Sequence, residues 1–516
     1  MQREEIAILD VREEAIFATG HPLFAANLPF SVIETEIYRR IPRRDTLLVV
    51  YDNGEGLAEK SLARLEDLGY INVQQLEGGL KGWEQAGGEV FIDVNAPSKA
   101  FGELVDFKRH TPSLSAEEVD QLISKKENVV VLDARRFDEY QTMSIPGSIS
   151  VPGAELVLRV QDLAPDPQTL VIVNCAGRTR SIIGTQSLVN AGISNRVAAL
   201  RNGTIGWTLA GQKLEHGQSR HFGEVSPENA ELALSRSRSV AARAGVKTIS
   251  FLALREFLED KDKTTYWFDV RMPEEYAAGH LHGFLSAPGG QLVQETDHFA
   301  PVRGARLILA DKEEVRANMT ASWLAQMNWE VFVLETPDNA FWLEKGFPEN
   351  PVPPFTNKPD LVDADTLSEF LRSDNELVVV DFAPSRQYLK GHIPNSWYAL
   401  RSGLDEAIEN LPSAEIYILT SPDGILAAFA ATEFKLLTNK PVFVLKGGTK
   451  SWVEHGYALT GPGDIHAQLA SPPHDRYRRP YEGTNIDPAA MEAYLEWEYG
   501  LVRQLDRDAT HGFFVL

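Results

Sequence analysis

The sequence predicts an α/β protein made of four tandem copies of one domain, each a mostly parallel sheet with helices on both faces. Two landmarks recur with the same rhythm along the 516 residues. One is an aspartate that ends an apolar strand, at Asp10, Asp133, Asp269 and Asp381. The other is a tryptophan that follows a turn, at Trp83, Trp207, Trp342 and Trp452. Both sets are spaced by roughly 110 to 136 residues, an ordinary domain size, so they predict a fourfold repeat.

Within each repeat the same elements follow one another. The strand that carries the aspartate is followed by a second apolar strand, at 47–50, 170–173, 307–309 and 416–419. A helical stretch comes next, with apolar residues three apart, as at Leu62, Leu65 and Leu68. A third short strand then leads to the turn and the tryptophan. Short apolar strands that alternate with helices are typical of a parallel sheet covered on both faces.

The repeats predict domains at 1–97, 110–218, 246–350 and 360–461, followed by a tail at 462–516. Apolar periodicity lapses at 96–111, 216–246 and 349–359, so we expect linkers there. The tail carries a basic cluster of Arg476, Arg478 and Arg479. It also predicts a helix over 488–506, because a proline stands at the favoured first turn and leucines recur along one side.

Composition excludes several classes of protein. Hydrophobic residues make up 43% and charged residues 24%, as in ordinary soluble domains. The net charge of -23 argues against nucleic acid and anionic membranes as partners. No apolar run approaches the roughly 18 residues of a membrane span, and the acidic start is no signal peptide, so we expect a cytoplasmic protein. With one cysteine, the chain can form neither an internal disulfide nor a cysteine-rich metal site.

The chemistry is predicted in one loop of the second repeat. A buried strand ends at Asn174, Cys175 follows, and a helix is expected from about Ser181. Ligands of parallel sheets bind at the carboxyl ends of strands, and a helix start directs N–H groups and its positive dipole end into the loop. Flanked by Arg178 and Arg180, the thiol is expected to have a lowered pKa and to be a nucleophilic thiolate near neutral pH.

The aspartate-ended strand, the Cys-x-Gly-x-x-Arg loop and the closing glycine-tryptophan turn resemble the rhodanese family of sulfurtransferases, over residues 1 to about 460. The resemblance implies that Cys175 takes sulfane sulfur from a small anionic donor such as thiosulfate. The persulfide then passes its sulfur to cyanide or a thiol, or to a sulfur-acceptor protein. It also implies a cradle of loop residues and no metal or organic cofactor. The cradle comprises Ala176, Gly177, Arg178, Thr179 and Arg180.

Each candidate residue also has a purely structural interpretation. Cys175 could be a small core residue, although Asn174 and two arginines beside it argue against that. Arg178 and Arg180 could be solvated charges or partners of the helix start. Asp133 and Arg135 are better explained as a buried structural ion pair than as an acid and base.

The histidines of the chain could suggest a metal site. However, Gly-His recurs at Gly20-His21, Gly279-His280 and Gly391-His392, where rhodaneses carry Gly-His-Ile, so we interpret it as a fold landmark. The second repeat has Met143-Ser144 there instead.

The other three repeats are expected to be inactive in sulfur transfer. Aligned without gaps, they place Asp52, Asp311 and Ser421 at the position of Cys175. A carboxylate cannot carry sulfane sulfur, and a serine without a base is a poor nucleophile. The three repeats therefore favour an alternative in which the protein is a scaffold or a sulfur relay.

A cysteine phosphatase or arsenate reductase is a weaker alternative, because those loops place arginine six residues after cysteine and here that residue is Ser181. The lack of a second cysteine means that sulfur must leave to a molecule from solution or to a partner protein. We therefore expect an open pocket mouth at Cys175.

Overall fold

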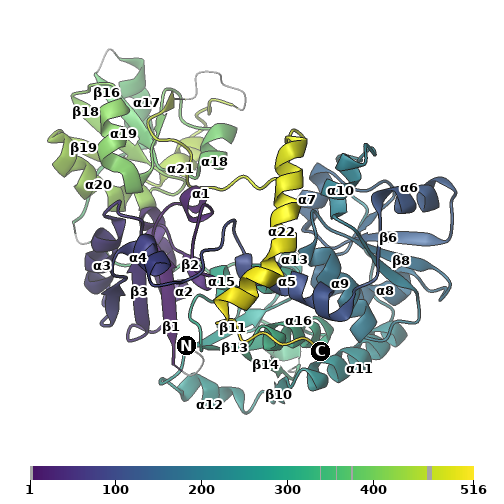
Figure 1. The fold of residues 1–516 in the computed structure, drawn as a ribbon. Coiled ribbons are helices and arrows are strands. Elements are labelled where there is room, and N and C mark those ends of the chain that lie inside the picture. Colours follow the sequence, from purple (N-terminus) through teal and green to yellow (C-terminus); the bar gives the residue numbers. More distant parts are fainter. Residues whose placement is uncertain (1–3, 337–338, 356, 374–375, 462–467) are drawn as a thin grey trace.

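The computed structural model describes residues 4–336, 339–355, 357–373, 376–461 and 468–516. The predicted starts of the first domain, at residue 1, and of the tail, at residue 462, lie outside these ranges. Within them the chain forms four sheets, and every strand pairing within these sheets is parallel. Helices cover the sheets, so the predicted fold class is confirmed (Figure 1).

The first two sheets define domain 1 and domain 2. Their strand orders are β2-β1-β3-β4 and β5-β9-β8-β6-β7. The elements of domain 1 are β1 (Ile6–Asp10), α1 (Glu14–Phe17), β2 (Ala25–Asn27), η1 (Phe30–Val32), α2 (Ile33–Arg40), β3 (Leu47–Tyr51), α3 (Leu57–Asp67), β4 (Val73–Gln75) and α4 (Gly79–Gln85). Those of domain 2 are β5 (Ser113–Leu114), α6 (Ala116–Ser124), β6 (Val129–Asp133), α7 (Phe137–Thr142), β7 (Ile149–Ser150), η2 (Gly153–Glu155), α8 (Leu156–Leu163), β8 (Leu170–Asn174), α9 (Thr179–Asn190), β9 (Val197–Leu200) and α10 (Gly203–Leu209).

Domain 3 and domain 4 repeat the arrangement, with orders β10-β14-β13-β11-β12 and β15-β19-β18-β16-β17-β20. The elements of domain 3 are β10 (Lys247–Ile249), α12 (Leu254–Glu259), β11 (Thr265–Asp269), α13 (Pro273–Ala278), β12 (Leu285–Ser286), α14 (Gly289–Gln294), α15 (Thr296–Phe299), β13 (Arg306–Ala310), α16 (Val315–Gln326), β14 (Glu330–Leu334) and η3 (Asn339–Phe341). Those of domain 4 are β15 (Asp360–Val362), α17 (Ala364–Arg372), β16 (Leu377–Asp381), α18 (Ser385–Lys390), β17 (Trp397–Tyr398), η4 (Arg401–Gly403), α19 (Leu404–Asn410), β18 (Ile416–Thr420), α20 (Ile425–Thr438), β19 (Val442–Leu445) and α21 (Gly448–Glu454).

Two stretches expected to be linkers are helices. Residues 96–111 contain α5 (Ala96–Arg109), which is buried from Ala96 to Val105, and residues 216–246 contain α11 (Pro227–Arg243). Both stretches join neighbouring domains as expected, but their helical structure was not predicted. α5 is enclosed on most sides and buries Lys99 and Glu103 together with apolar residues, so its sequence does not show a simple amphipathic period. The helix α11 was not predicted for a different reason. Its sequence is mostly polar, and only a narrow stripe around Ala233 and Val240 is buried.

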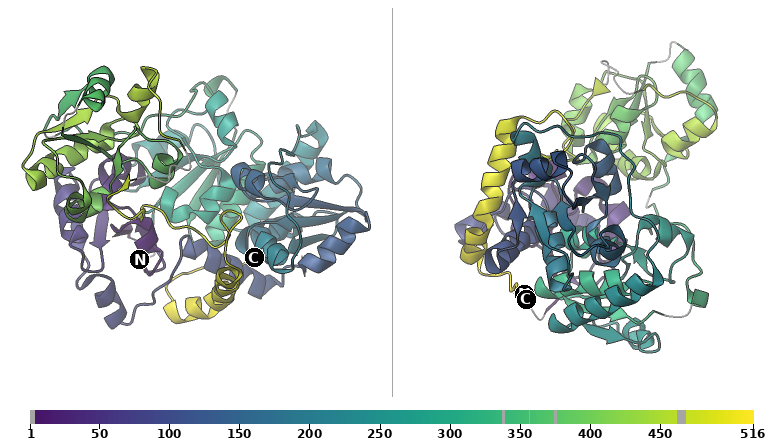
Figure 2. Two further views of the ribbon diagram at one scale, coloured as in Figure 1. Left: turned by 90° about the horizontal axis from the view of Figure 1, so that it is seen from above. Right: turned by 90° about the vertical axis from the view of Figure 1, so that its right-hand side faces the viewer.

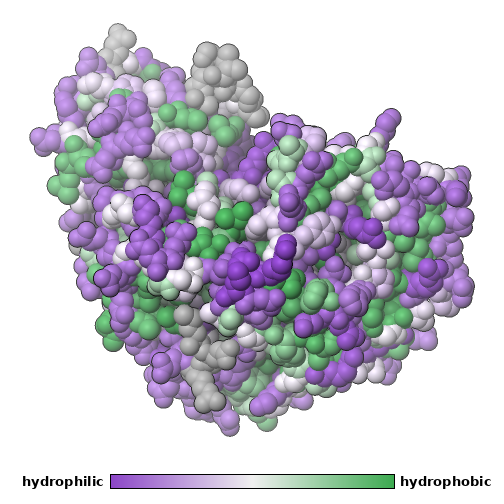
Figure 3. Space-filling model, viewed as in Figure 1, coloured by the Kyte–Doolittle hydropathy of each residue, from purple (hydrophilic) through white to green (hydrophobic). Residues whose placement is uncertain are grey.

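The four domains pack as one group in which domain 2 lies against domain 3 and domain 4 against domain 1 (Figures 1 and 2). Equivalent short segments make both contacts. η2 of domain 2 meets α14 of domain 3, where a Cβ on Gly290 would lie 3.3 Å from the backbone N of Gly153. In domain 4, Arg401 of η4 donates to the buried Glu34 of domain 1 at 2.5 Å. The space-filling view shows a notch between domain 4 and the part formed by domain 2 and the tail (Figure 3).

The tail joins the domains to one another. Its first described element, β20 (Gln468–Leu469), extends the sheet of domain 4 beside β17. The chain then crosses to domain 2 and ends in α22 (Pro488–Asp508), which packs along α5 (Figure 1). The helix predicted over 488–506 is therefore present. None of the described helices is both long enough and apolar enough to span a membrane.

Candidate active site

Cys175 stands at the carboxyl end of β8, between that strand and the start of α9. The loop is held from two sides. Asn174 donates to Asp133 at 2.7 Å, and the carbonyl of Cys175 accepts the backbone N–H of Thr204 at 2.9 Å. Gly203 has φ +54°, and a Cβ there would lie 2.3 Å from the carbonyl oxygen of Cys175. Only glycine allows α10 to approach the loop so closely.

The thiol itself is enclosed. Cys175 is 1% exposed, so the open pocket mouth expected from the sequence is absent. Burial raises the pKa of Cys175, because the charged thiolate loses its hydration. The nearby charge of Arg180 and hydrogen bonds with Ser181 act in the opposite direction, and the thiol donates to the Ser181 hydroxyl at 3.4 Å. The predicted lowering of the thiol pKa is therefore wrong for this closed state.

One backbone amide nevertheless favours negative charge at the sulfur position. The N–H of Ser181, six residues after the cysteine, lies at the start of α9 and acts to lower the pKa of Cys175. In the other domains the backbone N–H at the equivalent position donates to the side chain that stands in place of the cysteine. These bonds are Ala58 to Asp52 at 3.0 Å, Ala317 to Asp311 at 3.4 Å and Ala427 to Ser421 at 3.3 Å. In domains 1 and 3 the acceptor is a carboxylate. The helix start therefore suits an anion at this point, which a thiolate or a persulfide would supply.

Arg178 does not face the thiol. Its guanidinium donates to Glu103 of α5 at 2.6 and 2.9 Å and to Asp106 at 3.0 Å, and it lies over the ring of Tyr499. It connects the loop to α5 and α22. Arg178 was expected to contribute to the cradle, but these bonds direct its charge away from Cys175.

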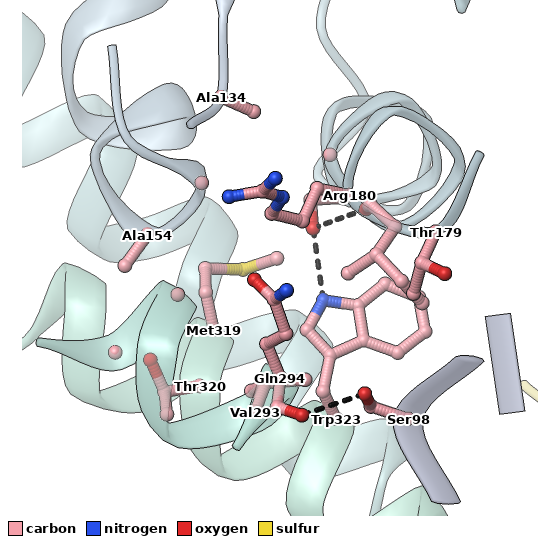
Figure 4. Close-up of a pocket in the computed structure, with 16 residues that line it drawn as sticks. Ser98, Ala134, Ala154, Thr179, Arg180, Val293, Gln294, Met319, Thr320 and Trp323 are labelled. Atoms are coloured by element: carbon pink, nitrogen blue, oxygen red, sulfur yellow. Dashed lines mark hydrogen bonds between the residues drawn. The ribbon is translucent and has the colours of Figure 1, made fainter. Parts of the chain in front are cut away.

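Arg180 is held by a carboxylate. It makes a two-pronged pair with Glu139 at 2.7 and 2.9 Å, and it lies on the side of α9 that faces Gln294 and Met319 of domain 3 (Figure 4). Burial would raise the pKa of Glu139, but Arg180 overcomes this and holds it at about 2. Because its charge still acts on Cys175, Arg180 is an electrostatic neighbour of the thiol.

Domain 3 contains the same pair without a cysteine. Arg316, five residues after Asp311, donates to Glu275 at 2.6 and 3.3 Å, as Arg180, five residues after Cys175, does to Glu139. An arginine-glutamate pair that is present in a loop without a thiol has a structural role there. The sequence did not reveal this role, because Glu139 lies 41 residues before Arg180.

The rest of the loop lies under the tail. Ala176 packs in a cluster with Tyr481 and Tyr494. A Cβ on Gly177 would lie 3.1 Å from both Tyr494 and Oε2 of Glu498. Thr179 packs against Gly102 of α5. No pattern in the sequence indicates that α22 covers this loop, because the contact joins residues about 320 positions apart.

Glu498 is the most unusual of the covering residues. It is 1% exposed, its Oε1 accepts the Tyr494 hydroxyl at 2.9 Å, and its Oε2 has no hydrogen-bond partner among the described residues. Burial and the charge of Glu103 raise the pKa of Glu498 to about 8. A carboxyl group beside the thiol is thus neutral at pH 7 and becomes charged in mildly alkaline solution.

The remaining candidate residues lie in the supporting structure. Arg135 donates to Asp133 at 2.9 and 2.8 Å and to the Met143 carbonyl at 2.6 Å, and this pair is fully enclosed. The histidines of the Gly-His landmark are buried and stack on aromatic rings. They are His21 on Phe17, His280 on Tyr276 and His392 on Tyr388.

Comparison with known proteins agrees with this arrangement. The rhodanese-like domain family matches residues 1–86, 115–210, 252–348 and 363–455. The crystal structure of a thiosulfate sulfurtransferase from Pseudomonas aeruginosa is 60% identical, has a TM-score of 0.97, and is matched over 100% of this chain and 97% of its own. A rhodanese-related protein from Thermoplasma volcanium is 25% identical over 20% of this chain and 97% of its own, with a TM-score of 0.18.

A curated relative, the HTH-type transcriptional regulator Rv0324 of Mycobacterium tuberculosis, is 29% identical over 99 residues. That match spans 43% of the regulator and 19% of this chain. The family matches cover most of the chain, in four domains that each hold a parallel sheet, and in domain 2 a cysteine directly follows the central strand. The prediction of a rhodanese-type sulfurtransferase is thereby confirmed: the chain belongs to the rhodanese family.

Proposed function

We propose that this protein is a thiosulfate sulfurtransferase that carries sulfur on Cys175 and passes it to cyanide or a thiol. The observation that carries the proposal is the start of α9 at Cys175, because the equivalent helix starts in domains 1 and 3 bind a carboxylate through a backbone N–H. Domain 2 is the only domain with a nucleophile at this anion-binding helix start. The likeness to the Pseudomonas aeruginosa enzyme over the whole chain supports thiosulfate as the donor.

In the first half-reaction the Cys175 thiolate attacks the outer sulfur of thiosulfate. The new bond joins the two sulfurs, the bond from the outer sulfur to the sulfonate sulfur breaks, and sulfite leaves with the electron pair. The enzyme then holds a persulfide anion. The amide of Ser181 and the charge of Arg180 are close enough to Cys175 to stabilise the attacking thiolate.

In the second half-reaction cyanide or a thiolate attacks the terminal sulfur. The sulfur-sulfur bond of the persulfide breaks, thiocyanate or a new persulfide leaves, and the Cys175 thiolate is restored. Because Cys175 is 1% exposed, both half-reactions require the covering tail to move.

The test is intact-mass spectrometry of the protein after exposure to thiosulfate, combined with thiocyanate formation from cyanide. One added sulfur, located on Cys175 by peptide mapping, is expected in the natural protein. Cys175→Ser should show neither the added mass nor turnover. Ser421→Ala, the matched change at the same loop position in domain 4, should retain both. Turnover by the pure Cys175→Ser protein would overturn the proposal.

A second candidate is a sulfur relay that transfers sulfur to a partner protein, favoured by the three domains without cysteine. Loading by thiosulfate without release to cyanide or small thiols would support the relay. Steady turnover with those acceptors would exclude it.

A further inference from the structure

A large basic cavity lies next to the active-site loop. It has a volume of about 570 Å³ and is lined by seven arginines and four carboxylates. Three of the arginines come from domain 2, one from domain 4 and three from the tail, and α14 of domain 3 adds Gln294. Such a concentration of positive charge contrasts with the net charge of -23 of the whole chain.

Several of these arginines already have partners, which sets them apart from the rest. Arg135 is bound to Asp133, Arg180 to Glu139, and Arg136 contacts Asp138 at 3.2 Å. These three charges are largely compensated within domain 2.

The arginines contributed by domain 4 and the tail are less well compensated. Arg476 pairs with Glu482, whereas Arg386 and Arg479 form no ion pair with any carboxylate of the described residues. Arg386, Arg476 and Arg479 line the same cavity, and burial together with the charges of the other two lowers the pKa of Arg476. The carboxylates that act on Arg479, Glu14 and Glu295 among them, do so from longer range. Guanidiniums that line one cavity without a direct ion pair keep N–H donors available for an anion of more than one charge.

The cavity reaches both the thiol loop and the outside. At one end it is lined by Arg180, whose charge acts on Cys175, and by Tyr481, which packs with Ala176. Beyond Arg386, Arg476 and Arg478 the basic lining continues into a second, more open hollow that adds Lys390. The volume falls within the usual range for small organic ligands, about 300 to 1,000 Å³, and is far larger than thiosulfate needs.

We propose that this cavity binds the sulfur acceptor, and that the acceptor is a small organic thiol carrying two or more carboxylate or phosphate groups. The proposal rests on the sulfurtransferase function proposed above. Arg386, Arg476 and Arg479 hold the anionic groups, and the thiol end points toward Tyr481 and Cys175. The acceptor sulfur attacks the terminal sulfur of the Cys175 persulfide, the persulfide bond breaks, and the thiol proton leaves on the product persulfide. The site thus assigns domain 4 and the tail a part in catalysis carried out by domain 2.

The experiment compares acceptors of different charge on protein preloaded with thiosulfate. The probes are mercaptosuccinate with two carboxylates, coenzyme A with phosphates, and neutral 2-mercaptoethanol. The variant is the double change Arg386→Gln and Arg479→Gln, and the control is Arg255→Gln, an arginine that is 83% exposed in domain 3. Rates of sulfur loss are followed by intact mass at fixed ionic strength.

We expect the double variant to lose about tenfold or more in kcat/KM for at least one anionic thiol, as loss of charge-assisted hydrogen bonds predicts. Turnover of 2-mercaptoethanol should change less than about twofold, and Arg255→Gln should behave as the natural protein. Inorganic pyrophosphate should compete with the anionic thiol in the natural protein and not in the double variant. Which of the two anionic thiols responds distinguishes carboxylates from phosphates.

Two results would overturn the acceptor site while leaving the proposed function intact. One is an equal effect of the double variant on all three thiols, or no effect on any of them. The other is a slower loading of Cys175 by thiosulfate with normal discharge, which would make the cavity a donor route. Failure of the natural protein to load sulfur at all would instead refute the proposed function.

Discussion

The buried carboxyl group of Glu498 should make the cover of the active site sensitive to pH, and Glu498→Gln should remove that sensitivity. Its pKa is raised from 4.5 to about 8 by burial and by Glu103. Because the pKa of Glu498 is raised in the folded state, the stability that this group contributes is complete below pH 4.5, where the carboxyl group is protonated in both the folded and the unfolded chain. It is lost progressively as the pH rises toward 8, because the unfolded chain ionises first. The amide of glutamine has nearly the same shape and does not titrate.

The size of the effect follows from the shift. A difference between 4.5 and about 8 corresponds at 1.36 kcal/mol per unit to about 5 kcal/mol, an upper bound, because local water entry reduces it. From pH 6 to the pKa of about 8 is about two pH units, so we expect the docking of α22 to weaken by at most about 3 kcal/mol over that range. Since a chain of several domains does not unfold in two states, the readout should be local.

Hydrogen exchange of the α22 amides, corrected for the intrinsic rate, measures this docking at pH 6 and pH 8.5. The natural protein should lose protection at the higher pH, whereas Glu498→Gln should keep it. The control is Glu496→Gln on the exposed side of the same helix. If the difference between the natural protein and Glu498→Gln is the same at both pH values, Glu498 does not titrate in this range and the reasoning is wrong.

Three further predictions concern the loop and its cover. Gly203→Ala should inactivate the enzyme, since its Cβ would lie 2.3 Å from the Cys175 carbonyl; Gly192→Ala, with φ +67° but open space around it, should cost only about 1 kcal/mol of stability and no activity. Arg180→Ala should raise the pKa of Cys175 and slow its alkylation at pH 7, by about tenfold for each pKa unit; an unchanged pH profile would show that this charge does not act on the thiol. Tyr494→Ala should speed alkylation of Cys175 by opening the cover over the loop, and an unchanged rate would place the entrance elsewhere.

The parts of the fold that could be predicted from the sequence are those set by local patterns. Buried strands such as β8 are short apolar runs, and residues equivalent to Asp133 and Trp207 recur at the same points of every repeat. The position of Cys175 at a strand end and a helix start follows from the same local order. Each of these features depends on residues within one repeat, so the sequence displays them directly.

The state of the thiol could not be predicted, because it depends on contacts between distant parts of the chain. A helix start and two arginines indicated a lowered pKa, but the tail excludes water from Cys175 and reverses the direction. Arg178 was expected near the thiol for the same local reason, and Glu103 of α5 draws it away. No periodicity within α22 tells which of its buried residues, Glu498 included, will face a loop in another domain.

Domain 3 shows a structural role for this loop in a repeat that has no cysteine. Arg316, at the position of Arg180, is fully buried and donates to Glu155 of domain 2 at 2.9 Å as well as to Glu275 of its own domain. Asp311, at the position of the cysteine, supplies a further carboxylate at 2.8 Å, and Glu313 supplies a fourth. A thiol there would leave the buried guanidinium with one fewer counter-charge, which is costly in an enclosed network. The aspartate therefore stabilises the contact by which the loop of domain 3 holds that domain against domain 2.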